Sequence, residues 1–300
     1  MRIVLTGSSG RVGRAIFAAL CQAEGEAHEV IGIDRVPFST TRVVADLADR
    51  ASIERTLEGA GAVIHAAGPH APHVGVVSDA EFAAINVEAT RWLYESALAE
   101  GVSRFLYTST TALYGHAVIE GACTWIDETT QPLPRTIYHR TKLAGEQALE
   151  ALATARLPVR VLRMSRSFPE PAPAMAVYRL HRGVDVRDVA SGHALALAHE
   201  GAPFERFILS GEPPFAPADC EALAKDAEAV LRAKAPALAA EFERRGWALP
   251  RTIDRVYSPA QAQTRLGWQM RHGWEEVLRQ LDRASLEVLP AAARIAARPE

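Results

Sequence analysis

Tyr138 and Lys142 are the two residues whose types and spacing first suggest chemistry. On a helix, residues four positions apart lie on one face, so both side chains can reach the same small molecule. A phenol beside an ammonium group can act as an acid–base pair, because the positive charge favours the phenolate. Many solvated helices carry such a pair without any catalytic role, so the interpretation depends on other residues converging on the same place.

A glycine-rich turn near the start of the chain predicts a nucleotide site. The stretch TGSSGRVG places Gly7, Gly10 and Gly13 between an apolar run and a helical pattern. Glycines at such a turn let the backbone approach a pyrophosphate, which then lies at the N-terminus of the helix. A plain strand–helix turn is the alternative, and it is disfavoured by an acidic residue, Asp34, about twenty residues further on.

Asp34 and its neighbour bear on the choice of cofactor. Asp34 ends the second apolar run, where a carboxylate can accept hydrogen bonds from the adenosine ribose hydroxyls and repel a 2′-phosphate. Arg35 follows directly and could pair with such a phosphate. The expected cofactor is therefore NAD, with NADP as the less favoured alternative.

Regular alternation of strand-like and helix-like runs indicates the fold that must position these residues. Strands are expected at 2–7, 29–34, 61–68, 104–110, 158–164 and 206–211, and helices at 11–25, 52–60, 79–101, 138–155 and within 184–201. Alternating strands and helices imply right-handed crossovers and a doubly wound, Rossmann-type parallel sheet of the α/β class, whose ligands lie at the carboxyl ends of the strands. The predicted division is a nucleotide-binding domain at 1–165, to which 184–210 returns, and a smaller, partly helical substrate lobe at 166–300. An alanine- and arginine-rich tail after Leu289 is expected to fray.

Composition excludes several classes of protein. The chain has 300 residues, is 48% hydrophobic and carries a net charge of −3, which gives no electrostatic case for nucleic acid or an acidic membrane. The apolar start MRIVLTG is too short for a signal peptide, and no apolar run would span a bilayer. Cys21, Cys123 and Cys220 are odd in number and have no metal-ligand spacing, which is typical of thiols in a reducing compartment. We therefore expect a cytoplasmic protein without a metal site.

Taken in order, the motifs of the chain resemble the extended short-chain dehydrogenase/reductases, the family of NAD-dependent epimerases and dehydratases that act on sugars. The matching pieces are TGSSGRVG, DL at Asp46, HAAG at 65–68, Asn86 in INVEAT, TSTTALYG at 108–115, YHRTK at 138–142, VDVRDVA at 184–190 and RVYSPAQAQTRLGW at 255–268. They cover nearly the whole chain. Each motif alone is weak, but the ordered set is specific.

The resemblance implies roles for individual residues. Tyr138 is expected to be the general acid/base, Lys142 its partner, and Thr110 the hydroxyl that holds the substrate oxygen, because Thr110 lies four residues before Tyr114 of YG. The ammonium of Lys142 and the positive nicotinamide of the bound cofactor should together bring the Tyr138 pKa down from about 10 toward neutral. The expected NAD contacts are Gly7, Ser9, Gly10, Arg11, Val12, Gly13, Asp34, Arg35, Asp46, Leu47, Ala66, Ala67, Gly68, Asn86, Thr108, Tyr138 and Lys142.

The substrate side departs from the family pattern. Family members that eliminate water carry an aspartate and a glutamate where this chain has Thr111 and Ala112, so a 4,6-dehydratase is not expected. The connection before VDVRDVA is only about twenty residues, which resembles compact sugar-acid dehydrogenases rather than sugar-nucleotide enzymes. The expected substrate contacts are Ser109, Thr111, His70, Arg166 and Arg179.

Three arginines in or near this short connection allow two interpretations. Arg166, Arg179 and Arg182 could clamp a phosphate or carboxylate, or they could pair with Glu170 and Asp185 or lie in solvent. His70 and His73 have metal-like proximity, but no carboxylate or cysteine lies near them in the sequence, so a zinc site is not expected.

The sequence therefore predicts an NAD-dependent epimerase-type oxidoreductase acting on a sugar or sugar nucleotide. A net dehydrogenase or reductase of a sugar acid or aldose is the first alternative. A nucleotide-binding protein without turnover is the second alternative, although such proteins typically lose the tyrosine or the lysine. The resemblance also implies a homodimer formed through two long helices of each subunit.

Overall fold

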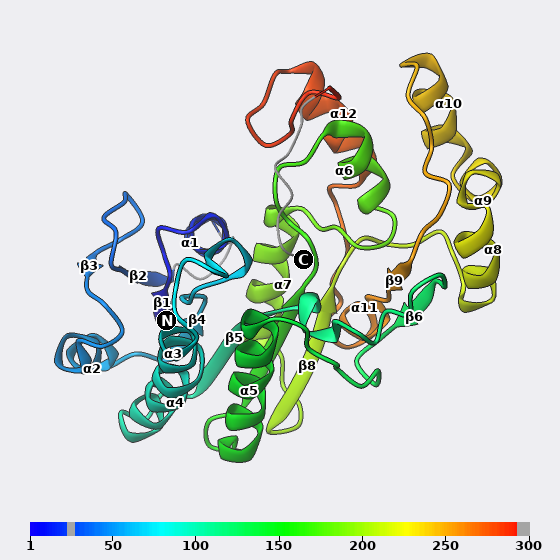
Figure 1. The fold of residues 1–300 in the computed structure, drawn as a ribbon. Helices are drawn as coiled ribbons and strands as arrows, with labels where there is room; N and C mark the ends of the chain where they lie inside the picture. Colours follow the sequence, from blue (N-terminus) through cyan, green and yellow to red (C-terminus); the bar gives the residue numbers. More distant parts are fainter. Residues whose placement is uncertain (23–27, 293–300) are drawn as a thin grey trace.

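A seven-stranded parallel sheet forms the centre of the molecule (Figure 1). The computed structural model describes residues 1–22 and 28–292, so Gly25 and the end of the tail lie outside the described residues. The strand order is β3-β2-β1-β4-β5-β7-β8, and every pair of neighbours is parallel. The strands are β1 (Arg2–Thr6), β2 (Glu29–Asp34), β3 (Val43–Val44), β4 (Ala62–His65), β5 (Arg104–Thr110), β7 (Val159–Met164) and β8 (Phe204–Leu209).

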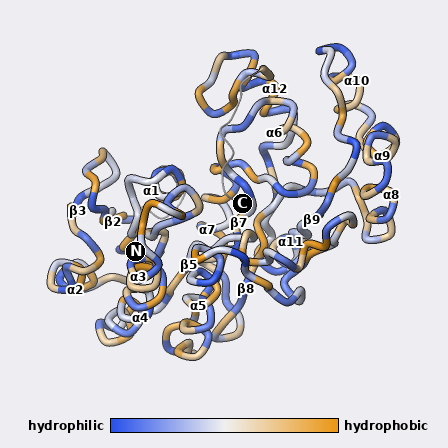
Figure 2. Tube along the Cα trace, viewed as in Figure 1, coloured by the Kyte–Doolittle hydropathy of each residue, from blue (hydrophilic) through white to orange (hydrophobic). Residues whose placement is uncertain are grey.

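Helices cover both faces of the sheet. The helices α1 (Arg11–Cys21), α7 (Val186–Ala198) and α11 (Ala260–Leu266) pack on one face, and α2 (Arg50–Leu57), α4 (Thr90–Ala99) and α5 (Ile137–Leu152) pack on the other. Figure 1 shows α4 and α5 side by side, and along both of them hydrophilic and hydrophobic residues alternate in Figure 2. The predicted doubly wound α/β fold is confirmed.

Successive strand residues feed two separate cores. On β1, the buried side chains of Ile3 and Leu5 pack with α1 and α7, whereas Val4 packs with the core beneath α4 and α5. Neighbouring residues of a strand point to opposite faces, so a strand covered on both faces reads as one continuous apolar run. This explains why the strand segments were recognisable in the sequence without alternation.

The long helix expected at 79–101 is interrupted. It consists of α3 (Asp79–Ala83), a π-helical segment (Ala84–Ala89) and α4, which ends at Ala99; Gly101, with a positive φ of 77°, lies in the turn that follows. The wider π turn contains Asn86, one of the expected cofactor contacts. Such turns are rare and frequently lie at functional sites.

The C-terminal lobe contains three elements that the sequence did not predict. The proline-rich stretch forms α6 (Ala172–Tyr178), and two short strands, β6 (Thr124–Ile126) and β9 (Arg255–Tyr257), pair in parallel. The other helices are α8 (Cys220–Lys225), α9 (Ala227–Lys234), α10 (Pro236–Arg244) and α12 (Trp274–Asp282). They share a core with α6 that includes Met175, Leu231, Phe242 and Val277. The exact division into domains stays a prediction.

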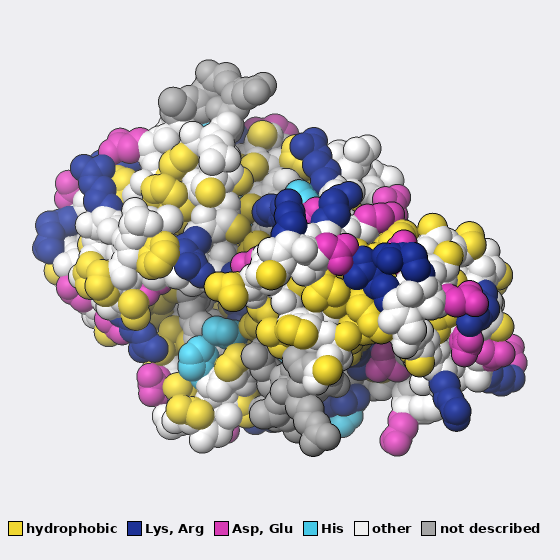
Figure 3. Space-filling model, turned by 90° about the horizontal axis from the view of Figure 1, so that it is seen from above, with side chains coloured by type: hydrophobic (Ala, Val, Ile, Leu, Met, Phe, Trp, Pro, Cys, Tyr) yellow, Lys and Arg dark blue, Asp and Glu magenta, His cyan; other side chains and the backbone are white. Residues whose placement is uncertain are grey.

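On the face of the molecule seen in Figure 3, basic, acidic and hydrophobic side chains are interspersed. Among the described residues, no helix is long and apolar enough to span a bilayer.

Candidate functional site

A cavity of about 420 Å³ lies where strands β1, β2, β4, β5 and β7 end. Its lining runs from the glycine turn after β1, past the ends of β4 and β5, to the segment that follows β7 and to β9. This volume suits a small-molecule or cofactor site. Its position at the carboxyl edge of a parallel sheet is the one that the fold predicts for ligands.

The glycine turn packs too tightly for side chains. A Cβ on Gly7 would lie 2.6 Å from the nitrogen of Ala67, and a Cβ on Gly13 would lie 2.0 Å from the carbonyl oxygen of Gly7. Helix α1 begins directly after Gly10, and no side chain caps it. The first N–H groups of a helix have no partner within it, so they suit a phosphate.

Asp34 lies at the end of β2 and lines the same cavity. Its carboxylate accepts hydrogen bonds at 3.0 Å from the backbone N–H groups of Ser9 and Val36, which fix its orientation. Ser9 itself does not line the cavity, because its hydroxyl bonds to Thr41 at 2.6 Å. The structure thus gives Ser9 the role of supporting Asp34, instead of the direct cofactor contact that we expected.

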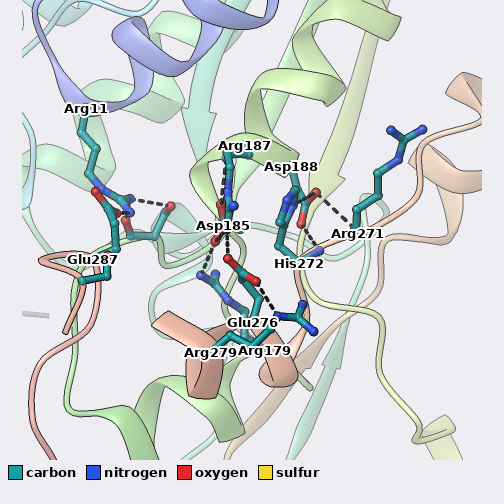
Figure 4. A network of polar contacts seen from close by, with 12 residues as sticks. Arg11, Arg179, Asp185, Arg187, Asp188, Arg271, His272, Glu276, Arg279 and Glu287 are labelled. Atoms are coloured by element: carbon teal, nitrogen blue, oxygen red, sulfur yellow. Dashed lines mark hydrogen bonds and ion pairs between the residues drawn. The ribbon is translucent and has the colours of Figure 1, made fainter. Parts of the chain in front are cut away.

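Arg11 ties the glycine turn to distant parts of the chain. Its backbone begins α1, while its guanidinium bonds to Ser167 after β7 and to Glu287 after α12 (Figure 4). These contacts bring three segments together at one end of the cavity. All the other expected cofactor residues line the cavity as well: Gly7, Gly10, Val12, Gly13, Asp34, Arg35, Asp46, Leu47, Ala66, Ala67, Gly68, Asn86, Thr108, Tyr138 and Lys142.

Asn86 holds the loop after β4. Its amide nitrogen donates to the carbonyl of Pro69 and to the hydroxyl of Thr141, both at 3.1 Å, and its buried Oδ1 has no hydrogen-bond partner within the described protein. A Cβ on Gly68, whose φ is +147°, would lie 2.3 Å from that Oδ1. A polar atom buried in the cavity wall without a partner is costly and suits a ligand contact.

The predicted acid–base pair lies at the start of α5. Thr136 caps this helix by accepting from His139 N–H at 3.3 Å, so Tyr138 falls in the first turn and Lys142 one turn later. Tyr138 and Thr110 line the cavity together. Burial raises the pKa of Tyr138 to about 12, although a hydrogen bond with the Thr110 side chain opposes the shift. The expected lowering of this pKa also involves the nicotinamide of bound NAD, and it stays a prediction.

Lys142 is buried as well. Its Nζ donates to the carbonyl oxygen of Thr108 at 2.7 Å and lies 3.8 Å from the centroid of the Tyr107 ring. Burial lowers the pKa of Lys142 to about 7, and the charge of Glu146 works in the opposite direction. The ammonium therefore loses its proton far more readily than an ordinary lysine.

The expected substrate contacts next to this pair differ in which other residues their side chains already contact. Thr111, Ser109 and His70 all line the cavity. The hydroxyl of Ser109 is already bonded to Glu146 at 2.5 Å, so only its remaining atoms face the space. His70 stacks on Phe168 at 6.2 Å between ring centroids, which gives the cavity an aromatic wall.

Arg166, Arg179 and Arg182 were expected either to hold an anionic substrate or to form ion pairs, and their positions in the structure differ. Arg166 lines the cavity and pairs with Glu170 at 2.5 Å, and Arg182 lines it and lies 3.7 Å from Asp254. Arg179 does not line the cavity, because its buried guanidinium pairs with Asp185 at 3.1 Å (Figure 4). The expected substrate contact of Arg179 is therefore corrected to a structural ion pair.

Several lining residues were not expected from the sequence. Arg255 and Tyr257 come from β9, and Arg135 and His139 come from the start of α5 and the loop before it. Only the quoted stretch RVYSPAQAQTRLGW carried a signal for the first two. Over the part of the chain that the structure describes, no group of three or more His, Cys, Asp or Glu side chains could hold a metal ion.

Known proteins share both sequence and fold with this chain. The NAD-dependent glucose-6-phosphate dehydrogenase of Haloferax volcanii is 29% identical over 170 residues, which are 48% of this chain and 60% of the relative. The dTDP-glucose 4,6-dehydratase of Streptomyces antibioticus is 27% identical over 208 residues, or 62% of this chain and 61% of the relative. The matches thus span less than two thirds of either relative.

A solved structure extends the likeness to nearly the whole fold. A short-chain dehydrogenase/reductase superfamily protein from Agrobacterium tumefaciens, solved with bound NAD, matches with a TM-score of 0.69 and 23% identity. The match covers 95% of this chain and 97% of that chain. The family model described as "NAD dependent epimerase/dehydratase family" matches residues 3–173, which include the glycine turn, Thr110, Tyr138 and Lys142. This chain therefore belongs to the NAD-dependent epimerase/dehydratase family, as its motifs predicted.

Proposed function

We propose that the protein binds NAD and oxidises a carbinol of a sugar or sugar derivative, returning the hydride as an epimerase does. The observation that carries the proposal is a single cavity with Asp34 and the glycine turn at one end and Thr110, Tyr138 and Lys142 at the other. The tight glycine turn and the unpartnered Oδ1 of Asn86 fit a dinucleotide. NAD bound there would supply the hydride acceptor.

The protein's own residues would handle the proton. Thr110 would hold the carbinol oxygen, and Tyr138 would take its proton as the hydride leaves and give it back on return. Lys142 would stabilise the phenolate of Tyr138 by its charge and hold the ribose next to the reacting carbon. The position of both side chains in the wall of one cavity supports these roles, because a charge interaction strengthens where water is partly excluded.

Three arginines support an anionic substrate. Arg166, Arg182 and Arg255 line the cavity; Arg166 pairs with Glu170, and Arg182 and Arg255 both pair with Asp254. A guanidinium recognises a carboxylate or phosphate with two parallel hydrogen bonds. We infer that the sugar carries at least one such group, as a sugar acid, a sugar phosphate or a sugar nucleotide does.

A net dehydrogenase is the second candidate, and the short connection between β7 and α7 favours it. That connection contains one helix of seven residues, α6, which leaves little chain for gripping a nucleotide diphosphate. The similarity to an NAD-dependent glucose-6-phosphate dehydrogenase supports the same alternative.

Nucleotide retention and a substrate screen separate the candidates. The purified protein is denatured to release and quantify NAD, and it is then assayed with sugars, sugar acids, sugar phosphates and sugar nucleotides at 340 nm. An epimerase is expected to retain NAD and to convert a sugar without net NADH, whereas a dehydrogenase accumulates NADH far beyond one equivalent. If NAD binds but no carbinol reacts, the protein is a nucleotide-binding protein and both candidates fail. The homodimer and the cytoplasmic location stay predictions.

A further inference from the structure

Lys142 is surrounded by groups that attract a positive charge. The carbonyl oxygen of Thr108 lies 2.7 Å from Nζ, and the face of the Tyr107 ring lies 3.8 Å from it. Glu146 follows one helical turn later on the same face of α5 and is fully buried. A carbonyl oxygen and an aromatic face therefore contact one buried ammonium, and a buried carboxylate lies one helical turn away.

Burial increases the effect of these groups on the charge of Lys142. A buried ammonium is costly, and in this cavity wall desolvation lowers the pKa of Lys142 to about 7. A lysine with this pKa is about half charged at neutral pH, so a change in any neighbour alters its charge under working conditions. A cation over a desolvated aromatic face contributes about 2 kcal/mol, enough to shift such a balance by about tenfold or more.

The other titratable groups around Lys142 do not replace these neighbours. His65 on β4 is buried, and its pKa falls to about 3 through desolvation and the charge of Lys142, so it stays neutral. Tyr138 has a pKa of about 12 and is neutral as well. Arg163 on β7 and Arg206 on β8 bind Glu146 at 2.6 and 3.4 Å, and Ser109 donates to it at 2.5 Å. These contacts fix the carboxylate beside Lys142.

We propose that Tyr107 and Glu146 are positioning residues that keep Lys142 charged, the first through its ring face and the second through its carboxylate. The catalytic meaning of this inference rests on the proposed function, in which Lys142 stabilises the phenolate of Tyr138. The charge on Lys142 is a property of the protein alone and can be measured without substrate.

The composition of the chain makes that measurement direct. The sequence contains three lysines, Lys142, Lys225 and Lys234. Lys225 pairs with Glu221 and Lys234 with Asp219 on exposed helices of the C-terminal lobe, far along the chain from the site. Protein labelled with ¹³C at the lysine ε-carbon should give three signals, two of which serve as internal controls. We expect the Lys142 signal to titrate near pH 7 and the other two well above it.

Tyr107 is tested with a matched pair of variants. Tyr107→Phe keeps the aromatic face and should leave the midpoint of Lys142 unchanged. Tyr107→Leu removes the face and should lower the midpoint by about one pH unit. Because a leucine at this buried position can disturb packing, 3,5-difluorophenylalanine at position 107 provides a second test that keeps the shape and weakens the ring's negative face. Equal midpoints for phenylalanine and difluorophenylalanine in folded protein would overturn the role of Tyr107.

Glu146 is tested by removing its charge. Glu146→Gln keeps an oxygen that can accept from Ser109 and Arg163, and it should lower the Lys142 midpoint. If this variant does not fold because Arg163 loses its counter-ion, the double variant Glu146→Leu with Arg163→Leu replaces it. The midpoint should fall there as well, since Glu146 is the charged group that acts on Lys142. An unchanged or higher midpoint in the folded variant would refute the role of Glu146.

The same variants separate this inference from the proposed function. In an active enzyme, the alkaline limb of the kcat–pH profile should move to lower pH with the NMR midpoint. Shifted midpoints in a protein that oxidises no carbinol would refute the proposed function while supporting the charge-holding role. Unshifted midpoints in an active enzyme would refute the charge-holding role and leave the proposed function intact.

Discussion

At the scale of single residues, burial shifts the pKa values of the two proposed catalytic side chains in opposite directions. It raises the pKa of Tyr138 to about 12 and lowers that of Lys142 to about 7, and both shifts favour the neutral forms. A phenolate and an ammonium in one buried site stabilise each other, so their ionisation is coupled. The proposed chemistry therefore needs both groups.

Removing the Tyr138 hydroxyl tests this dependence. Tyr138→Phe keeps the ring and the packing of α5 but removes the proton acceptor, so turnover should fall by roughly a hundredfold or more. NAD binding, followed by quenching of protein fluorescence, should remain within a few-fold of the native value. Full activity in the variant would exclude Tyr138 from the mechanism.

The charge of Asp34 should decide between NAD and NADP. Because the carboxylate also accepts from Ser9 and Val36, an alanine at this position would disturb the turn as well as the charge. Asp34→Asn keeps an acceptor and removes the repulsion of a 2′-phosphate, so the preference for NAD should shrink by about tenfold. Dissociation constants for both nucleotides measure the effect. A native protein that prefers NADP would mean that Arg35 dominates.

At the scale of elements, the turn between β1 and α1 depends on Gly13 more than on Gly10. A Cβ on Gly13 would lie 2.0 Å from the Gly7 carbonyl oxygen and 2.9 Å from the Ser8 Cα, and backbone atoms cannot yield as a side chain can. A Cβ on Gly10 would lie 3.3 Å from the same oxygen, and its φ of −68° suits alanine. The two positions thus differ in the space that the fold leaves them.

Alanine variants should reproduce this difference. Gly13→Ala should force α1 away from β1 and lower the free energy of unfolding by about 2–4 kcal/mol, the range of severe packing defects. Gly10→Ala, the matched control, should change it by less than about 1 kcal/mol. Urea unfolding of both variants provides the comparison. Equal stabilities would show that the turn relaxes around the added methyl group.

Which elements could be predicted depended on their length and contacts. The strands β1, β2 and β5 have five to seven mostly buried residues, so they read as apolar runs, whereas the two-residue edge strand β3 was not predicted. By contrast, β6 and β9 have three residues each and pair across about 130 positions of sequence, which no local pattern records. The sequence did carry a signal for helix α6, since proline is common in the first turn of a helix. The prediction did not use that signal.

For the site, the sequence predicted positions along the chain better than side-chain directions. The motif order predicted that Tyr138, Lys142 and Asp34 would line one cavity, since strand ends of a parallel sheet share an edge. Ser9 and Arg179 lie in the expected segments, but their side chains bond to nearby residues and do not line the cavity. Those partners, Thr41 and Asp185, become neighbours only once the surrounding turns are formed.

At the scale of the whole molecule, buried histidines connect elements on both sides of the sheet. His65 on β4 bonds to Thr6 at 2.7 Å and to Thr90 at 2.9 Å. His193 on α7 bonds to Thr108 at 2.8 Å, and His181 donates to the carbonyl of Arg255 at 2.7 Å. Burial disfavours the charged form of each histidine, whereas the hydrogen bonds of His181 and His193 to backbone carbonyl oxygens act in the opposite direction. Desolvation is the main reason that their pKa values fall, to about 3 for His65 and His181 and to about 4 for His193.

These lowered pKa values make the stability of the fold depend on pH. An unfolded histidine takes up a proton below about pH 6.5, whereas the folded ones stay neutral down to about pH 3–4. Their contribution is fully present above pH 6.5 and is lost as the pH falls toward the folded values, by about 1.4 kcal/mol per pH unit for each histidine. The free energy of unfolding should therefore drop steeply between pH 6.5 and 5, and urea titrations at several pH values measure it.

The variant His181→Asn keeps a donor for the carbonyl of Arg255 but cannot ionise. Between pH 7 and pH 5 its free energy of unfolding should therefore fall by about 2 kcal/mol less than that of the native protein. Parallel curves for the variant and the native protein would show that His181 is protonated in the folded state or that acidic groups alone set the acid limit.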